Sequence, residues 1–280
     1  MTKKIIIIGA GNMGFAIAQG LKNKNIYNKE SIVFIETNKG RSKQIKSKGF
    51  KVLSGFNELG KAIHSFKNIE AIIIAIKPKD IKSVIGEITK YIPQDTLIIS
   101  IAAGIEIKTL SFLTGSKYPI ARVMPNILCE QNEGISAVSK NNKVTSKHSK
   151  TLKKIFESLG KCISMKEKYF DLVTAVSGSG PAYFCYLIEC LTEGAVKSGL
   201  NKNDAYQLVL QTGLGTCTML LKSNIKPDEL RSRVTSPKGT TDAAINIFKK
   251  MNLRNIILTA LHSAKKRSLE LGKKARAETK

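Results

Sequence analysis

The chemistry-bearing stretch nearest the amino terminus is GAGNMG, residues 9–14, which follows an isoleucine-rich run and opens a helical pattern. This spacing is typical of the glycine turn that binds the pyrophosphate of a dinucleotide. Gly9 permits a tight turn, Gly11 lets a phosphate approach the backbone, and Gly14 lets helix and strand pack closely. The N–H groups at the helix N-terminus favour an anion. The stretch predicts a dinucleotide site, and an ordinary glycine turn is the alternative.

The residues after the second predicted strand give conflicting indications about the nicotinamide cofactor. Glu36 closes that strand, and a carboxylate there normally accepts the ribose 2′-OH of NAD and repels the 2′-phosphate of NADP. Asn38, Lys39 and Arg41 follow directly, and they suit a phosphate. Glu36 could instead face solvent and pair with a lysine. These residues therefore leave both NADP and NAD open.

A third candidate lies in AIKP, where a further strand ends. Pro78 stops that strand and places Lys77 at the carboxyl edge of the predicted sheet, where ligands bind in open α/β folds. A solvated surface lysine is the alternative reading of Lys77.

The elements that must position these residues alternate between strands and helices. Several strand candidates are apolar throughout, as expected of strands covered on both faces of a parallel sheet. Predicted strands cover residues 4–10, 31–37, 71–78, 96–104, 118–126, 134–140 and 161–166, and predicted helices cover residues 14–24, 40–49, 79–92 and 145–160. This rhythm predicts an α/β Rossmann-type, doubly wound N-terminal domain over residues 1–166.

The remainder, residues 167–280, contains helical patterns only, which predicts an all-α C-terminal domain. Predicted helices cover residues 182–200, 203–223, 227–234, 242–252 and 255–272. Several are apolar around much of their circumference, so they must be buried. Because these helices alone make a thin core, we expect a homo-oligomer in which helices of two subunits pack together.

One stretch near the start of this region, VSGSGPAYF, combines two Ser-Gly pairs with a proline. We expect Ser177 to Pro181 to begin a long helix, with uncovered N–H groups and glycines that allow close approach to a nicotinamide. The alternative is that Gly178 and Gly180 only allow helix to pack on helix.

Composition narrows the class of protein. The formal net charge is +25, but the lysines are scattered and not interleaved with aromatic residues, so we favour a solvated basic surface over a nucleic-acid partner. No apolar run approaches the roughly 20 residues of a membrane span. The five cysteines form no C-x-x-C pair, which indicates buried, reduced thiols and no metal site. We therefore expect a cytoplasmic protein.

Six motifs, in order, resemble the pyrroline-5-carboxylate reductase family: GAGNMG, AIKP, RVMPN, VSGSGPAYF, RSRVTSPKGTT and KKRSLELG. The resemblance covers nearly the whole chain, and SGSGPAYF with TSPKGTT is its most specific part. It implies a Rossmann domain and a helical dimerisation domain, often in larger rings of dimers. It also implies reduction of L-Δ1-pyrroline-5-carboxylate to L-proline with NADPH or NADH, the last step of proline biosynthesis.

The resemblance also implies roles for individual residues. The implied cofactor-binding residues are Gly9, Gly11, Asn12, Met13, Gly14, Asn57, Ala75, Lys77, Pro78 and Asn126, the last lying after Met124 and Pro125 beside the nicotinamide. Asn57 would touch the adenosine end. The implied substrate-binding residues are Ser236, Gly239, Thr240 and Thr241, which would hold the substrate carboxylate.

The loop SPKGTT precedes a helix, so its backbone N–H groups and threonine hydroxyls can hold a carboxylate there. Thr241 is the candidate catalytic residue, because it could also hydrogen-bond the ring nitrogen; an N-cap role for Thr240 or Thr241 is the alternative. Two departures from the family's usual pattern stand out. Lys238 replaces a glycine, and Ile127–Leu128 replaces Thr-Pro.

Other classes remain as alternatives. A β-hydroxyacid or 6-phosphogluconate type of reductase needs a catalytic lysine near an asparagine in the helical domain, and Lys197 has no such partner at the right spacing. A non-catalytic dinucleotide sensor would not need the substrate loop.

Overall fold

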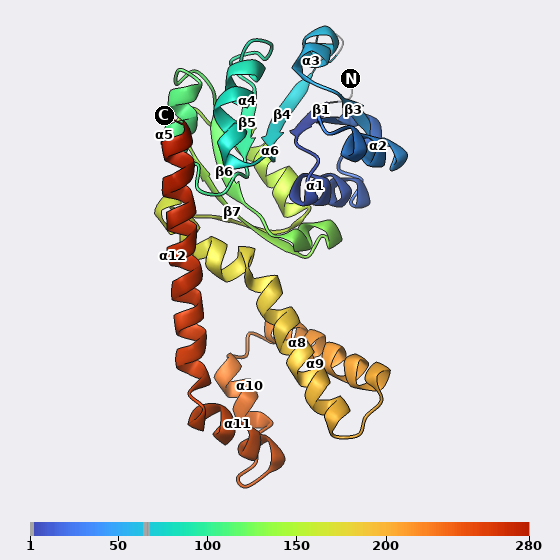
Figure 1. Cartoon of the computed structure of the whole chain (residues 1–280), viewed down its shortest axis with the longest axis vertical. Coiled ribbons are helices and arrows are strands. Elements are labelled where there is room, and N and C mark those ends of the chain that lie inside the picture. The colour runs from blue at the N-terminus through green and yellow to red at the C-terminus, as the bar shows by residue number, and fades with distance from the viewer. Residues whose placement is uncertain (1–2, 64–65, 67, 280) are drawn as a thin grey trace. The chain divides into compact units, whose positions relative to one another are not determined.

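The computed structural model describes residues 3–63, 66 and 68–279. Its contacts divide the chain into two compact units (Figure 1). The sheet unit comprises residues 1–179 and 264–280, and the helical unit comprises residues 180–263. The sequence predicted a single boundary after residue 166. The sheet unit extends further because Glu167 forms an ion pair with Arg122 and Asp171 accepts a hydrogen bond from Ser268.

An eight-stranded sheet forms the centre of the sheet unit. Its order is β3-β2-β1-β4-β5-β6-β7-β8, and all neighbouring strands are parallel except the antiparallel pair β6–β7. The strands are β1 (Lys4–Ile8), β2 (Ile32–Ile35), β3 (Lys51–Leu53), β4 (Ile69–Ile74), β5 (Leu97–Ser100), β6 (Ile120–Met124), β7 (Gly134–Lys140) and β8 (Gly160–Ser164). The predicted parallel, doubly wound sheet is confirmed.

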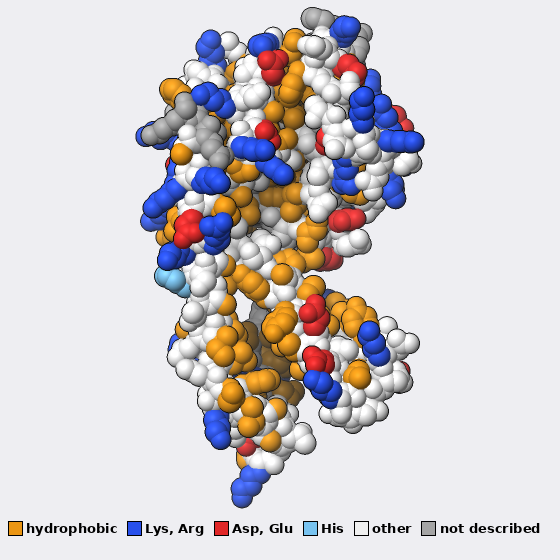
Figure 2. Space-filling view, in the orientation of Figure 1, with side chains coloured by type: hydrophobic (Ala, Val, Ile, Leu, Met, Phe, Trp, Pro, Cys, Tyr) orange, Lys and Arg blue, Asp and Glu red, His pale blue; other side chains and the backbone are white. Residues whose placement is uncertain are grey.

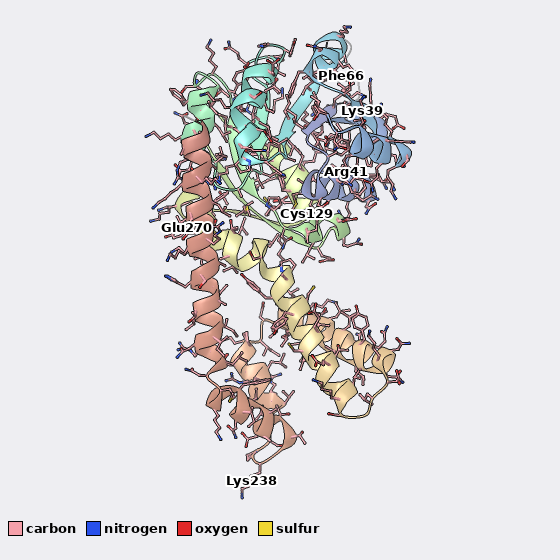
Figure 3. All side chains as sticks on the ribbon, viewed as in Figure 1. Lys39, Arg41, Phe66, Cys129, Lys238 and Glu270 are labelled. Atoms are coloured by element: carbon pink, nitrogen blue, oxygen red, sulfur yellow. The ribbon has the colours of Figure 1, made fainter. Side chains whose placement is uncertain are left out.

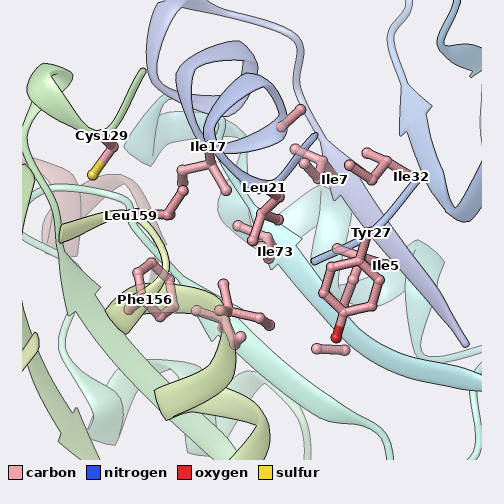
Figure 4. Packing of buried hydrophobic residues seen from close by; sticks show 14 of the residues in the cluster. Ile5, Ile7, Ile17, Leu21, Tyr27, Ile32, Ile73, Cys129, Phe156 and Leu159 are labelled. Atoms are coloured by element: carbon pink, nitrogen blue, oxygen red, sulfur yellow. The ribbon is translucent and has the colours of Figure 1, made fainter. Parts of the chain in front are cut away.

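Both faces of the sheet are covered, which explains the continuous isoleucine runs. Side chains alternate between faces along a strand, so Ile5 and Ile7 enter one apolar cluster while Ile6 and Ile8 enter the other. All four are buried. Figure 4 shows the first cluster, in which Ile5 and Ile7 lie among side chains from neighbouring strands and helices.

Helices of the sheet unit lie on both faces. Residues of α1, α2 and α6 contribute to the cluster around Ile5, and residues of α3, α4, α5 and the last part of α12 contribute to the cluster around Ile6. The bounds are α1 (Asn12–Asn23), α2 (Lys39–Ser47), α3 (Phe56–Ile63), α4 (Ile81–Ile88), α5 (Ile107–Leu113), α6 (Ser146–Glu157), α7 (Phe170–Val173) and α12 (Leu253–Thr279). Strand β3 and helices α3, α5 and α7 were not predicted.

The long helix α8 begins within the stretch VSGSGP, at Gly180, as predicted. Helix α7 continues into a π-helical turn, Thr174–Gly178, and α8 follows from Gly180. The N–H of Ser179 donates to the carbonyl of Thr174 at 2.8 Å, so this backbone is paired. The expectation of an uncovered helix mouth here is therefore wrong. A proline cannot donate to the carbonyl four residues before it, and the wider turn accommodates Pro181.

The last part of α12 packs on the sheet unit through a close backbone contact. A Cβ at Gly104, whose φ is +76°, would lie 2.5 Å from the Cα of Gly272. Arg276 forms an ion pair with Glu106 one helical turn beyond. Ala275 is buried in the apolar cluster of that face. The glycines thus allow two backbones to meet where side chains could not fit.

The helical unit consists of α8 (Gly180–Lys197), α9 (Lys202–Ser223), α10 (Pro227–Arg233), α11 (Thr240–Lys250) and the first part of α12. Many of its large apolar side chains are exposed, including Phe184, Tyr186, Leu214 and Ile256. Figure 2 shows apolar side chains gathered on these helices, whereas lysines and arginines are spread over the sheet unit. In the part of the chain that the structure describes, no helix has the length and apolar character needed to cross a membrane.

The cysteines only partly match the expectation of buried thiols. All five are unpaired, Cys129 is buried and Cys162 is half-buried. Cys185, Cys190 and Cys217 are exposed because they lie on α8 and α9, whose apolar faces are uncovered in the single chain.

Candidate functional site

The glycine turn between β1 and α1 has a backbone that only glycine permits at two of its positions. Gly9 has a φ of +94°, and a Cβ there would lie 2.5 Å from the carbonyl oxygen of Ala75. A Cβ at Gly14 would lie 2.3 Å from the carbonyl oxygen of Gly9 and 3.1 Å from the Cβ of Ala75. Ala75 therefore serves the turn by packing against it, and the turn joins β1, α1 and β4.

Gly11 differs from these two glycines because a Cβ there would meet no atom within 4 Å. It is the N-cap of α1, with φ −63° and ψ −178°, a conformation open to any residue. It is exposed, as is Asn12, while Met13 is half-buried. The first-turn N–H groups of a helix have no acceptor within the helix. The open space beside Gly11 and the donors of α1 together fit a pyrophosphate.

The side chain of Glu36 points toward the glycine turn and does not pair with a lysine in the described structure. Its Oε2 accepts from the N–H of Ala10 at 2.9 Å, and its Oε1 accepts from the N–H of Asn38 at 2.8 Å. The side chain of Asn38 caps α2 by accepting from the N–H of Arg41 at 2.9 Å. The guanidinium of Arg41 donates through Nε to the carbonyl of Ala10. Sequence reasoning did not identify Ala10 as the residue that these side chains hold.

Lys39, the first residue of α2, is exposed (Figure 3). Lys77 is also exposed, and its backbone caps the short helix Pro78–Asp80 after β4. Asn57 is exposed in the first turn of α3 and lines a hollow of about 350 Å³ with residues 54–58 and Glu87. This hollow follows the carboxyl end of β3, the edge at which open α/β sheets bind ligands.

Asn126 has its side-chain amide engaged on both sides by backbone. Its Nδ2 donates to the carbonyl of Ser177 at 3.3 Å, and its Oδ1 accepts from the N–H of Ile135 at 3.4 Å. It is buried, with 5% of its surface exposed. A Cβ at Gly178 would lie 3.2 Å from the methyl carbon of Met124. The strand end RVMPN therefore supports the π-helical turn, a link that no sequence pattern indicated.

The loop before α11 forms a tight turn in the helical unit. Gly239 is the N-cap of α11, so the alternative that Thr240 or Thr241 is the N-cap is wrong. A Cβ at Gly239 would lie 2.3 Å from Oγ of Ser236, and its N–H donates to the Ser236 carbonyl at 3.0 Å. Thr240 is exposed and Thr241 is half-buried, both in the first turn of α11. Their N–H groups lie where a helix favours an anion.

Lys238 adopts the left-handed conformation in this loop, with a φ of +59°. The carboxylate of Asp242 accepts from the Lys238 N–H at 3.2 Å and from the side-chain amide of Asn246 at 3.3 Å. The loop thus keeps the glycine-like backbone although a lysine stands there. The Asp242 hydrogen bond holds that conformation.

The structure brings many of the predicted residues together within each unit. In the sheet unit, Gly9, Gly14 and Ala75 touch, and Glu36 and Asn38 reach the same turn. In the helical unit, Ser236 to Thr241 form one turn and helix start. The glycine turn of the sheet unit and the helix start of the helical unit each present backbone N–H donors, which suit an anion.

Comparison with known proteins gives matches over both regions. Residues 4–104 match the family described as NADP oxidoreductase, coenzyme F420-dependent. Residues 167–271 match the family described as pyrroline-5-carboxylate reductase dimerisation.

Individual relatives match over nearly their full length. The chain is 34% identical over 275 residues to a pyrroline-5-carboxylate reductase of Methanosarcina acetivorans, covering 97% of this chain and 99% of that protein. It is 34% identical over 264 residues to one of Pisum sativum, covering 94% of each. A crystal structure of Plasmodium falciparum pyrroline carboxylate reductase with NADP bound superimposes with a TM-score of 0.86 at 33% identity, covering 96% of this chain and 98% of that one.

Proposed function

Because the chain belongs to the pyrroline-5-carboxylate reductase family, we propose that it reduces L-Δ1-pyrroline-5-carboxylate to L-proline, the last step of proline biosynthesis. NADPH is the proposed hydride donor, and NADH is an allowed substitute. The observation that carries the proposal is that similarity to reductases of this name extends over 97% of the chain and 99% of a relative. The open glycine turn and the free helix start of α11 support it independently.

The proposed cofactor contacts lie along the carboxyl edge of the sheet. The turn from Gly9 to Gly14, including Asn12 and Met13, would hold the pyrophosphate through backbone N–H groups. Asn57 would meet the adenosine end, because it lines the hollow beyond β3. Lys77 and Pro78 would flank the cofactor after β4, and Asn126 would support the nicotinamide end through its backbone, since its amide is engaged internally.

The proposed substrate contacts belong to the start of α11. Each charge-assisted hydrogen bond to a carboxylate contributes about 1.5–3 kcal/mol. The N–H groups of Thr240 and Thr241 and the hydroxyls of Ser236 and Thr241 are the candidate donors, and Gly239 keeps the turn tight. Thr241 is the proposed catalytic residue, because its hydroxyl can also reach the ring nitrogen of a carboxylate-bound substrate.

The reaction needs positioning more than strong acid catalysis. The protonated cyclic imine is already electrophilic at carbon. The bound cofactor supplies a hydride to that carbon, and the π electrons of the C=N bond become the lone pair of the proline nitrogen. The protein must hold donor and acceptor carbons about 3–3.5 Å apart and exclude water. The proposal therefore requires cofactor and substrate to meet in the assembled enzyme, within one subunit or between two.

We propose the division of labour that the sequence suggested, with residues 1–166 binding the dinucleotide and residues 167–280 binding the substrate and forming the dimer. A homodimer, or a larger ring of dimers, is supported by the match to a dimerisation family and by the exposed apolar side chains of α8 and α9. Such exposed surface usually marks an interface. We also propose a cytoplasmic location, supported by the five unpaired cysteines.

The direct test uses purified protein, pyrroline-5-carboxylate and each reduced cofactor in turn. The expected result is substrate-dependent loss of reduced-nicotinamide absorbance, with proline as the product. Absence of turnover with both cofactors, while NADPH still binds, would favour a non-catalytic dinucleotide sensor. Absence of both binding and turnover would overturn the proposal.

A further inference from the structure

Four hydrogen bonds form a closed ring between the glycine turn and the start of α2. The N–H of Ala10 donates to Glu36 Oε2, and the carbonyl of Ala10 accepts from Arg41 Nε. The N–H of Arg41 donates to Asn38 Oδ1, and the N–H of Asn38 donates to Glu36 Oε1. We call these four residues the Ala10 clasp. Both backbone polar groups of one turn residue are thus held by oppositely charged side chains.

We infer that Glu36 and Arg41 are positioning residues that hold the glycine turn in its cofactor-binding conformation before the cofactor binds. The inference rests on the proposed function, because it concerns the turn that would bind the pyrophosphate. Ala10 lies between Gly9 and Gly11, and glycine is the residue with the largest conformational freedom. Anchoring the Ala10 carbonyl orients the peptide plane that carries the Gly11 N–H. A preformed site avoids the entropy lost on ordering a loop during binding.

Arg41 is itself held in place, which argues against a mobile side chain that only seeks a phosphate. Its Nη1 donates to Gln44 Oε1 at 2.6 Å, and its guanidinium lies 5.7 Å from the ring centroid of Phe15. The Phe15 ring in turn lies 6.2 Å from that of Phe50, edge to face. Ala10 is fully buried, and buried backbone groups require partners. The side chains of Glu36 and Arg41 therefore provide the hydrogen-bond partners of the buried Ala10 backbone.

This arrangement has a consequence for cofactor selectivity. The clasp acts on the part of the site that NADPH and NADH share, so weakening it lowers the affinity for both by the same factor. A carboxylate that accepted the ribose 2′-OH would instead affect NADH selectively, and an arginine that bound the 2′-phosphate would affect NADPH selectively. The ratio of the two affinities therefore separates positioning from direct recognition.

Charge-conserving variants test this without changing the net charge of the segment. Glu36→Asp shortens the carboxylate arm, and Arg41→Lys removes Nε from its position. Each is expected to weaken NADPH and NADH by a common factor of about ten, since hydrogen bonds to charged groups are lost. The double variant is expected to be about as weak as the weaker single variant, because both residues act on Ala10. Glu30→Asp and Lys43→Arg are matched controls at exposed positions and are expected to bind like wild type.

The second readout is independent of cofactor and activity. Amide hydrogen exchange at Ala10, measured by NMR on the cofactor-free protein labelled with 15N-alanine, is expected to be about tenfold faster in each variant. A selective loss of one cofactor with unchanged Ala10 exchange would overturn the inference. If the wild-type protein bound neither cofactor, the proposed function would fail, and Ala10 exchange would still decide whether Glu36 and Arg41 hold the turn.

Discussion

Two glycines of the same turn have opposite structural roles, and alanine substitution separates them. In Gly11→Ala the new Cβ meets no protein atom within 4 Å, and the N-cap conformation suits alanine, so the folded protein should lose less than about 1 kcal/mol. The same Cβ would occupy the space beside the α1 donors. Losing one charge-assisted hydrogen bond to pyrophosphate weakens binding by about 1.5–3 kcal/mol, roughly ten- to a hundredfold in Kd.

Gly14→Ala is the contrasting variant. Its Cβ would lie 2.3 Å from the carbonyl oxygen of Gly9, so the backbone must shift, at about 1–3 kcal/mol. The assay pairs thermal unfolding without cofactor with NADPH titration by fluorescence. Gly11→Ala should unfold like wild type and bind NADPH poorly, whereas Gly14→Ala should already unfold at a lower temperature. A folded Gly11→Ala protein with wild-type NADPH affinity would refute the assignment of this turn to pyrophosphate.

Three further predictions concern other parts of the chain. Thr241→Ala should lower kcat about tenfold or more while leaving NADPH affinity intact, and Thr241→Ser should retain much of the activity; an unchanged kcat in the alanine variant would exclude a catalytic hydroxyl. The pKa of Glu70 lies below its usual 4.5 because hydrogen bonds from neighbouring side chains outweigh the opposing effect of burial. The ionised Glu70 carboxylate therefore stabilises the fold above pH 4.5, and this contribution is lost as the pH falls through the lowered pKa. The free energy of unfolding of Glu70→Gln should be about 1–3 kcal/mol lower than that of wild type at pH 7. The difference between the two proteins should narrow on acidification. Gly104→Ala should destabilise the protein by about 2–4 kcal/mol, because left-handed strain adds to the 2.5 Å approach of the new Cβ to Gly272. Gly115→Ala is the control, with a φ of +59° and no atom nearer than 3.8 Å to the new Cβ, and should cost only about 1 kcal/mol. Equal unfolding temperatures for the two variants would contradict this prediction.

The central strands could be predicted because burial on both faces demands continuous apolar residues. Runs such as Ile5–Ile8 satisfy both clusters at once, and few other structures tolerate them. Strand β3 contains only three residues, Lys51–Leu53, and lies at the edge of the sheet, so its pattern is too short to recognise. The seven residues of α5 are similarly few for a helical period. The strand and helices that the sequence did not predict are therefore the short ones.

The site was predictable where backbone geometry demands particular residues and less so where side-chain direction decides the role. The glycine turn could be predicted from the sequence because a side chain at Gly9 or Gly14 would clash with the backbone. Glu36 left two readings open, because a strand end does not specify where its carboxylate points. The direction follows from the position of the Ala10 N–H, which exists only once β1 and β2 are paired in register.

The stretch around Pro181 shows how one residue pattern can have two structural solutions. Small residues before a proline are typical of a helix start, since proline suits the first helical turn. Here α8 does begin at Gly180, but it follows directly on a π turn that continues α7, so the carbonyl of Ser177 requires another donor. The buried amide of Asn126 supplies that donor from the end of β6, while Gly178 leaves room for Met124. An asparagine distant in sequence thus supplies the hydrogen bond that the proline cannot donate, and the local sequence pattern does not indicate this partner.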